Sequence, residues 1–192
     1  MIKLQTKGDI YIMLKKIFKF SALIACGLAL VGFILMMATP SVVYLDNVNN
    51  YYSGVAAIFG KGPAHFEAGL GGLGTLVNDG TFEGKLAVTA LLAWIFVLVA
   101  MLVVCASFVI SMLKVKVGEK VAAVMDLVVI GLLLVGGVLM FFTVPAFFAA
   151  NEWNGASDWG LGAGWIIGAI LVIAGGVFAA LPVVSAFMGK KK

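Results

Sequence analysis

Four long hydrophobic segments alternate with polar joints along this chain. They cover residues 20–38, 86–113, 121–150 and 160–188. An α-helix of about 20 apolar residues crosses the ~30 Å hydrocarbon core of a bilayer, and even the shortest segment has about 19 residues. The three later segments approach about 28 residues, or about 42 Å of helix, so we expect them to tilt or to extend beyond the bilayer. The pattern predicts an all-α membrane protein built as a four-transmembrane-helix bundle.

The polar joints complete the division of the chain. They comprise a basic N-terminal flank (1–19), a long first outer loop (39–85), a short inner loop (114–120), a second outer loop (151–159) and a lysine tail (189–192). The flank and the first hydrophobic segment together resemble a signal peptide, but no A-x-A cleavage site follows them, which favours a retained helix.

Single residues mark where some of these segments begin, bend or end. Met13 and the residues after it are typical of a natural translation start, which would make residues 1–12 an upstream extension. Pro145 and Pro182 lie near the ends of the third and fourth segments, where we expect a kink or a helix end.

The first outer loop contains two stretches that favour β-strands. Residues 41–46 and 51–59 are rich in β-branched and aromatic residues, and a turn-like cluster at 47–50 separates them. The loop is too apolar for a solvated tether, so we expect it to form a small outer hairpin or sheet that lies on the helix ends. Recognition of a partner is expected here. The candidate contact residues are Tyr44, Tyr51, Tyr52, Phe59, His65 and Phe66.

The distribution of lysine predicts how the chain is threaded. Five lysines lie in the N-terminal flank, three around the inner loop and three in the tail, whereas the second outer loop has none and carries Glu152 and Asp158. The positive-inside rule therefore places both termini in the cytoplasm of a multi-pass cell-membrane protein. Trp153, Trp159 and Trp165 fall at the opposite boundary, where indole rings prefer the headgroup level.

Four spans with both ends inside, a long first outer loop and a short second one resemble the layout of claudin-like tetraspan proteins. The resemblance implies a small outer sheet standing on a four-helix bundle. That family's first loop carries a Trp-Gly-Leu-Trp stretch followed by two cysteines, whereas residues 39–85 contain neither. The resemblance is therefore one of topology, and it assigns no functional residues.

Small residues recur at helical spacing in three of the segments. Such faces let helix backbones approach closely, which replaces the hydrophobic driving force that is missing in lipid. Packing within one bundle is the main expectation, and packing between subunits is the alternative. The residues are Gly160, Gly164, Gly168 and Gly175 in the fourth segment, Ala93, Ala100 and Ser107 in the second, and Ala25 and Ala29 in the first.

Asp126 is an acidic residue about five positions into the third segment. An intramembrane carboxylate is a candidate proton or cation site. Its depth of about 7–8 Å along the helix also suits an interfacial or paired structural role beside Lys120 or Lys19. A transport role needs a second polar partner at matching depth, and the segments offer only neutral Ser and Thr residues for it.

Composition and residue chemistry narrow the function further. The 192 residues are 63% hydrophobic and 11% charged, and the lysines that give the net charge of +4 cluster at segment ends, which argues against a nucleic-acid surface. No arginine is present, which disfavours anionic-ligand sites. His65 is the only histidine and has no second ligand at a suitable spacing, so we expect no metal, no cofactor and no enzymatic activity.

The two cysteines are expected to be packing residues. Cys26 and Cys105 both lie inside hydrophobic segments and could be neighbours, but a reducing inner face disfavours a disulfide. The first outer loop lacks cysteine, and this absence favours either a bacterial origin or a loop that is held by packing on the helices beneath it.

These observations leave three functions open. The first is a non-enzymatic integral membrane protein whose first outer loop makes lateral or partner contacts, with a second copy or with another membrane protein. The second is a small transporter or channel subunit that uses Asp126. The third is an accessory subunit of a larger membrane complex. The lipid bilayer is the partner common to all three.

Overall fold

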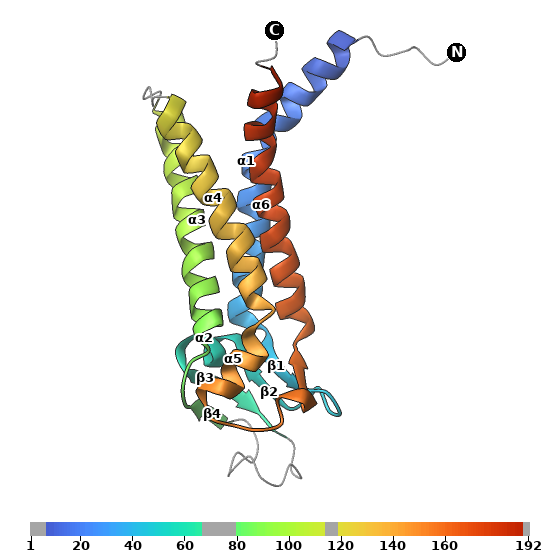
Figure 1. The fold of residues 1–192 in the computed structure, drawn as a ribbon, viewed down its shortest axis with the longest axis vertical. Helices are drawn as coiled ribbons and strands as arrows, with labels where there is room; N and C mark the ends of the chain where they lie inside the picture. Colours follow the sequence, from blue (N-terminus) through green and yellow to red (C-terminus); the bar gives the residue numbers. More distant parts are fainter. Residues whose placement is uncertain (1–6, 67–79, 114–118, 190–192) are drawn as a thin grey trace, which may run out of the picture.

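Long helices dominate the fold. The computed structural model describes residues 7–66, 80–113 and 119–189, and it is mostly helical, at 70%. Within these residues, four long helices lie side by side, a small antiparallel sheet covers one end of them, and α1 begins and α6 ends at the opposite end (Figure 1). The long helices are α1 (Lys7–Ala38), α3 (Val88–Met112), α4 (Glu119–Met140) and α6 (Ala163–Gly189).

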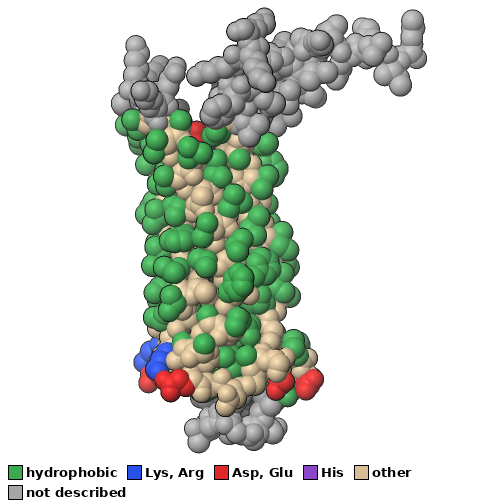
Figure 2. All heavy atoms as spheres, viewed as in Figure 1, with side chains coloured by type: hydrophobic (Ala, Val, Ile, Leu, Met, Phe, Trp, Pro, Cys, Tyr) green, Lys and Arg blue, Asp and Glu red, His purple; other side chains and the backbone are tan. Residues whose placement is uncertain are grey.

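Three of these helices are long and apolar enough to cross a membrane. Their apolar spans are Val88–Ser107, Val121–Met140 and Ala163–Leu181, and the described part of α1 adds a shorter apolar stretch, Leu23–Ala38. Hydrophobic side chains cover the sides of the bundle, whereas most of the charged side chains visible in Figure 2 lie at the sheet end. This distribution is that of a membrane-embedded helical protein.

Glycine and alanine set the spacing between the helices. α1 packs most extensively against α6, α6 against α4 and α4 against α3, whereas α1 and α3 share a smaller interface. A Cβ atom added at Gly168 of α6 would lie 3.2 Å from the carbonyl oxygen of Gly32, and one added at Gly175 would lie 3.1 Å from that of Ala25. The backbones of α1 and α6 can approach this closely because no side chain stands between them.

The third hydrophobic segment is interrupted, whereas the sequence predicts one stretch over 121–150. α4 ends at Met140, a turn occupies residues 141 and 142, and a separate helix, α5 (Thr143–Ala150), follows. The N–H groups of the two turn residues bond to carbonyl oxygens three positions earlier, each at 3.1 Å, which tightens the end of α4. Pro145 then lies in the first turn of α5, where its missing N–H leaves no hydrogen bond unmade.

The sheet has five antiparallel strands in the order β4-β3-β2-β1-β5. A small antiparallel sheet was predicted for residues 39–85, and β1 and β2 are indeed paired across a turn. The last strand comes from a distant part of the chain, where it pairs with β1 after the short 3₁₀ helix η1 (Ala156–Asp158). The strands are β1 (Pro40–Tyr44), β2 (Tyr51–Ser53), β3 (Lys61–His65), β4 (Gly80–Glu83) and β5 (Trp159–Leu161).

The second predicted strand, 51–59, is wrong over its later part. β2 ends at Ser53, and Gly54–Phe59 forms a short helix, α2. The side-chain oxygen of Ser53 accepts a hydrogen bond from the N–H of Ala56 at 3.2 Å and caps this helix. Gly60 ends it in the left-handed region, at φ 72°, and donates its N–H to the carbonyl of Ala56. Two local caps thus outweigh the β-propensity of the stretch.

Replacing Gly168 by leucine should destabilise the bundle. The new side chain would meet the backbone of α1, and overpacking of this kind costs about 1–3 kcal/mol. We expect a lower melting temperature in detergent. Gly131→Leu on α4 is the matched control, because nothing lies within 4 Å of a Cβ atom at Gly131. Equal melting temperatures for the two variants would contradict the close packing of α1 on α6.

Candidate functional site

The sheet, α2, α5 and the residues up to 162 form one compact unit at the end of the bundle, which we call the cap (described residues 39–66, 80–87 and 143–162). A cluster of aromatic rings forms its core. Tyr52 of β2 is 1% exposed and lies at the centre of the cluster. Its ring centroid is 5.0 Å from that of Phe147 in α5 and 5.6 Å from that of Trp159 in β5. The remaining neighbours, at 5.1–5.7 Å, are Phe66, Phe82 and Trp153.

Two predicted contact residues therefore belong to the core. Tyr52 is enclosed by rings from both loops, and Phe66 is 4% exposed. Burial raises the pKa of the Tyr52 phenol, so this side chain stays neutral. Neither residue is available to a partner. The sequence predicted contact because aromatic residues in a loop were assigned to its surface, whereas this loop folds around them.

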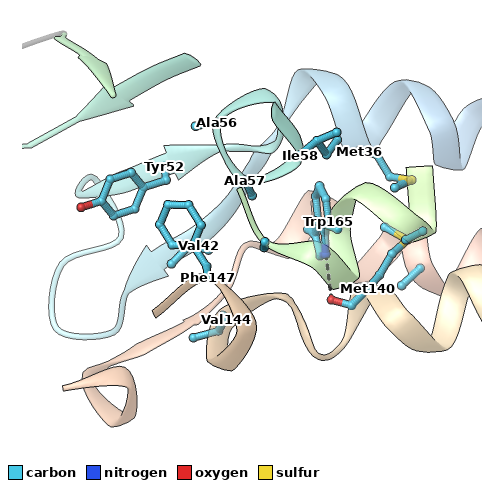
Figure 3. Packing of buried hydrophobic residues seen from close by; sticks show 14 of the residues in the cluster. Met36, Val42, Tyr52, Ala56, Ala57, Ile58, Met140, Val144, Phe147 and Trp165 are labelled. Atoms are coloured by element: carbon cyan, nitrogen blue, oxygen red, sulfur yellow. Dashed lines mark hydrogen bonds between the residues drawn. The ribbon is translucent and has the colours of Figure 1, made fainter. Parts of the chain in front are cut away.

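A second contact layer attaches the cap to the helix ends. Trp165 of α6 is fully buried, and its indole N–H donates a hydrogen bond to the carbonyl of Met140 at 3.0 Å (Figure 3). Met36 at the end of α1 and Ile58 of α2 lie in the same buried cluster. Since Trp165 contacts the last turn of α4, the helix ends and the cap share one core.

Asn151 fastens the second loop to the first. Its Oδ1 accepts the N–H of Lys85 at 2.8 Å, and its Nδ2 donates to the carbonyls of Lys85 and Phe147, each at 2.9 Å. The Lys85 Nζ also lies 2.6 Å from Oε1 of Glu152, and this hydrogen bond and charge lower the pKa of Glu152. The exposed pair therefore stabilises the fold above the ordinary pKa of glutamate, and its contribution is lost as the pH falls through the lowered value.

The turn between β1 and β2 (residues 45–50, the 45–50 turn) is held by its own hydrogen bonds. The N–H of Asn50 bonds to the carbonyl of Asn47 at 3.0 Å, and Oδ1 of Asn47 accepts the N–H of Asn49 at 3.1 Å. The N–H of Tyr44 bonds to the carbonyl of Asn50 at 2.9 Å. These bonds give the turn a defined shape.

The 45–50 turn exposes two apolar side chains. Leu45 is 57% exposed and Val48 is 67% exposed. Beside them the hydroxyl of Tyr44 donates to Oδ2 of Asp46 at 3.3 Å, and the charge of Asp46 raises the pKa of Tyr44. The turn therefore combines an apolar surface with a polar edge.

The other predicted contact residues lie elsewhere on the cap. Tyr51 and His65 face each other on β2 and β3, where their rings stack at 5.8 Å and both are half-buried. Phe59 is 43% exposed, and its ring meets that of Trp94 on α3 at 5.3 Å. Tyr51 directly follows the 45–50 turn and pairs with His65, whereas Phe59 lies beside α3.

The predicted helix-packing residues of the first and fourth segments mostly meet each other. The side of α6 that faces α1 carries Gly168 and Gly175, and Gly164 on the same side lies beside Thr39, just after the end of α1. Ala25 and Ala29, each 1% exposed, lie on α1.

The second-segment residues lie on α3. Ala93 and Ala100 are fully buried, and the carbonyl of Ala93 would be 3.5 Å from a Cβ atom at Gly136 of α4. Ser107 is half-buried, and its hydroxyl donates to the carbonyl of Val103 at 2.9 Å. Gly160 needs a correction: it lies in β5 and not in a helix, because this stretch is extended by pairing with β1.

Polar residues within the helices are sparse. Asp126 lies in α4 and is exposed, whereas the side chains of its predicted partners, Lys19 and Lys120, lie outside the described part of the structure. Cys26 and Cys105 are free cysteines, of which Cys26 on α1 is half-buried and Cys105 on α3 is exposed. Among the described residues, no group of three or more His, Cys, Asp or Glu side chains could hold a metal ion.

Sequence reasoning missed the residues that close the cap. Phe82, Phe147 and Asn151 were not singled out, although all three connect one loop to the other. The high aromatic content of residues 147–159 was the available signal, but it was assigned to the membrane boundary.

Comparison with protein-family models, curated proteins and solved structures finds no match to this chain.

Replacing Asn151 by alanine should loosen the second loop. The substitution removes three hydrogen bonds at a partly buried position, for an expected loss of about 1–3 kcal/mol. Limited proteolysis in detergent should then cut the cap faster than in the wild type. Asn154→Ala is the matched control, since Asn154 is exposed in the same loop. Cleavage of both variants at the wild-type rate would show that Asn151 does not hold the loop.

Proposed function

We propose that this chain is an integral membrane protein with four spans, α1, α3, α4 and α6, in the claudin-like layout. α1 has 32 residues, or about 48 Å of helix, which exceeds a hydrocarbon core of about 30 Å. α1 begins, α3 ends, α4 begins and α6 ends at the end of the bundle away from the cap (Figure 1). The lysines of these joints support a cytoplasmic placement of that end and an outer placement of the cap.

Labelling of single cysteines tests this threading. In a background without Cys26 and Cys105, a membrane-impermeant maleimide added to intact cells should label Ser157→Cys in the cap. It should label Lys192→Cys only after permeabilisation. The reverse pattern would place the cap in the cytoplasm and overturn the orientation.

The function that follows is non-enzymatic interaction with a neighbouring membrane protein through the cap. The observation that carries it is the 45–50 turn, which exposes Leu45 and Val48 and is held by internal hydrogen bonds. In the described cap, these two and Phe59 are the exposed large hydrophobic residues, and Phe59 already meets Trp94. Preorganised apolar groups reduce the entropic cost of association. The surface is small, so it favours a lateral contact of modest affinity.

A photo-crosslinking residue at Val48 tests the contact in native membranes. We expect a discrete adduct that weakens several-fold when Leu45→Asn is added, because the second substitution places a polar group in the interface. The same crosslinker at Ser157 is the control site, in the cap but outside the turn. The Leu45→Asn variant should keep the wild-type melting temperature, since Leu45 is exposed. An equal, diffuse pattern from both crosslinker sites would reject a specific contact at this turn.

A further inference from the structure

Two acidic side chains border the exposed apolar pair of the 45–50 turn. Asp46 follows Leu45 in the chain and lies two residues before Val48. The N–H of Leu45 donates to the carbonyl oxygen of Asp158 at 2.9 Å, which brings a second acid beside the turn. Both acids are exposed. The charge of Asp46 is the main cause of the raised pKa of the Tyr44 phenol, and the charge of Asp158 raises this pKa further. Apolar and negatively charged groups therefore lie together at this turn.

Both lysines of the cap are already paired with other acids. The Nζ atom of Lys61 forms an ion pair with Oε1 of Glu83. The Nζ atom of Lys85 lies 2.6 Å from Oε1 of Glu152. In Figure 2, the basic side chains at the sheet end lie next to acidic ones at one side, whereas acidic side chains stand without a basic neighbour at the other side. The negative charge beside the turn is therefore not balanced by either lysine.

The sequence supplies no other lysine for this surface. Residues 39–87 and 143–162 contain six acidic residues, two lysines and one histidine, and the charged residues within 67–79 are all acidic. The other eleven lysines lie in or before α1, around the joint between α3 and α4, and in the tail after α6. Lys19 is the closest of these to the cap along its helix, yet it precedes Ala38 by 19 residues, or about 28 Å. A lysine side chain does not cover that distance, so the cap keeps its net negative charge.

This charge restricts what can cover the turn. Complementary potentials steer association, whereas like charges placed opposite each other across an interface are strongly unfavourable. A surface that covers Leu45 and Val48 comes next to Asp46, so a basic surface fits there and an acidic one does not. A second copy that docked through the same turn about a two-fold axis would bring the two Asp46 carboxylates and the two Asp158 carboxylates together.

We propose that the 45–50 turn binds an outer segment of a different membrane protein, which places a lysine or arginine against Asp46 and an apolar side chain over Leu45 and Val48. This partner chemistry rests on the function proposed above, and it excludes a second copy docked turn to turn. Because Asp46 is exposed, the ion pair is of modest strength and weakens as salt is added.

Charge variants of Asp46, combined with the photo-crosslinker at Val48 in native membranes, test the proposal. Asp46→Asn should lower the yield of the discrete adduct about two- to fivefold, the range that an exposed charge pair contributes. Asp46→Lys should remove the adduct, and Asp46→Glu should retain it. Glu83→Gln is the matched control, because it removes the same charge from β4, at the opposite edge of the sheet from β5. All four variants should keep the wild-type melting temperature, since both acids are exposed.

Two designed peptides test the charge preference without the natural partner. The purified full-length protein, with the crosslinker at Val48, is placed in phosphatidylcholine nanodiscs. One peptide alternates leucine with lysine, and the other alternates leucine with glutamate. At low salt we expect about tenfold more crosslinking of the lysine peptide, because attraction favours one peptide and repulsion disfavours the other. Asp46→Lys should remove this preference.

The outcomes distinguish the chemistry of the partner from the contact itself. A discrete Val48 adduct with the same yield in Asp46→Asn and Asp46→Lys, or equal crosslinking of the two peptides, would overturn the basic partner and leave the contact at the turn standing. An adduct that joins two differently tagged copies of this chain, or one with the mass of a lipid, would overturn it in favour of that occupant. Absence of any discrete adduct in membranes would reject the contact and its partner together.

Discussion

Contact between Tyr52 and the rings of Phe147 and Trp159 is the interaction on which the rest of this structure depends. It brings together β2 from the first loop, α5 from the end of the third hydrophobic segment and β5 from the stretch before α6. Aromatic side chains bury large apolar areas, so a few of them suffice for a small core. The cluster adds buried side-chain contact to the pairing of β1 with β5 and to the hydrogen bonds of Asn151 that also join the two loops.

The cap and the long helices are stabilised by different interactions. The cap is stabilised by burial of apolar rings away from water. The helices, surrounded by lipid, gain little from such burial and rely instead on close backbone contact at Gly168 and Gly175. This difference explains why aromatic residues concentrate in the cap core while small residues mark the interface between α1 and α6.

The sequence predicted features that local patterns determine and missed those that depend on distant pairing. Long apolar runs gave the helices, and the turn cluster between two β-rich stretches gave the pairing of β1 with β2. The sequence did not predict α2, because the caps at Ser53 and Gly60 outweigh the strand propensity of the residues between them. The sequence did not predict β5 either, because its three residues carry no strand signal of their own and become a strand only beside β1. Tyr52 was assigned to the surface for the same reason, since its burial depends on Phe147 and Trp159.

The two ends of the bundle are closed to different extents. At the cap end, α1, α3, α4 and α6 are joined through the sheet, α2, α5 and the indole of Trp165. Toward the other end, most side chains of α4 from Val121 to Val128 are exposed. A change in helix separation costs least where fewest contacts must break. The cap end is therefore the end at which a change in helix separation would have to break the most contacts.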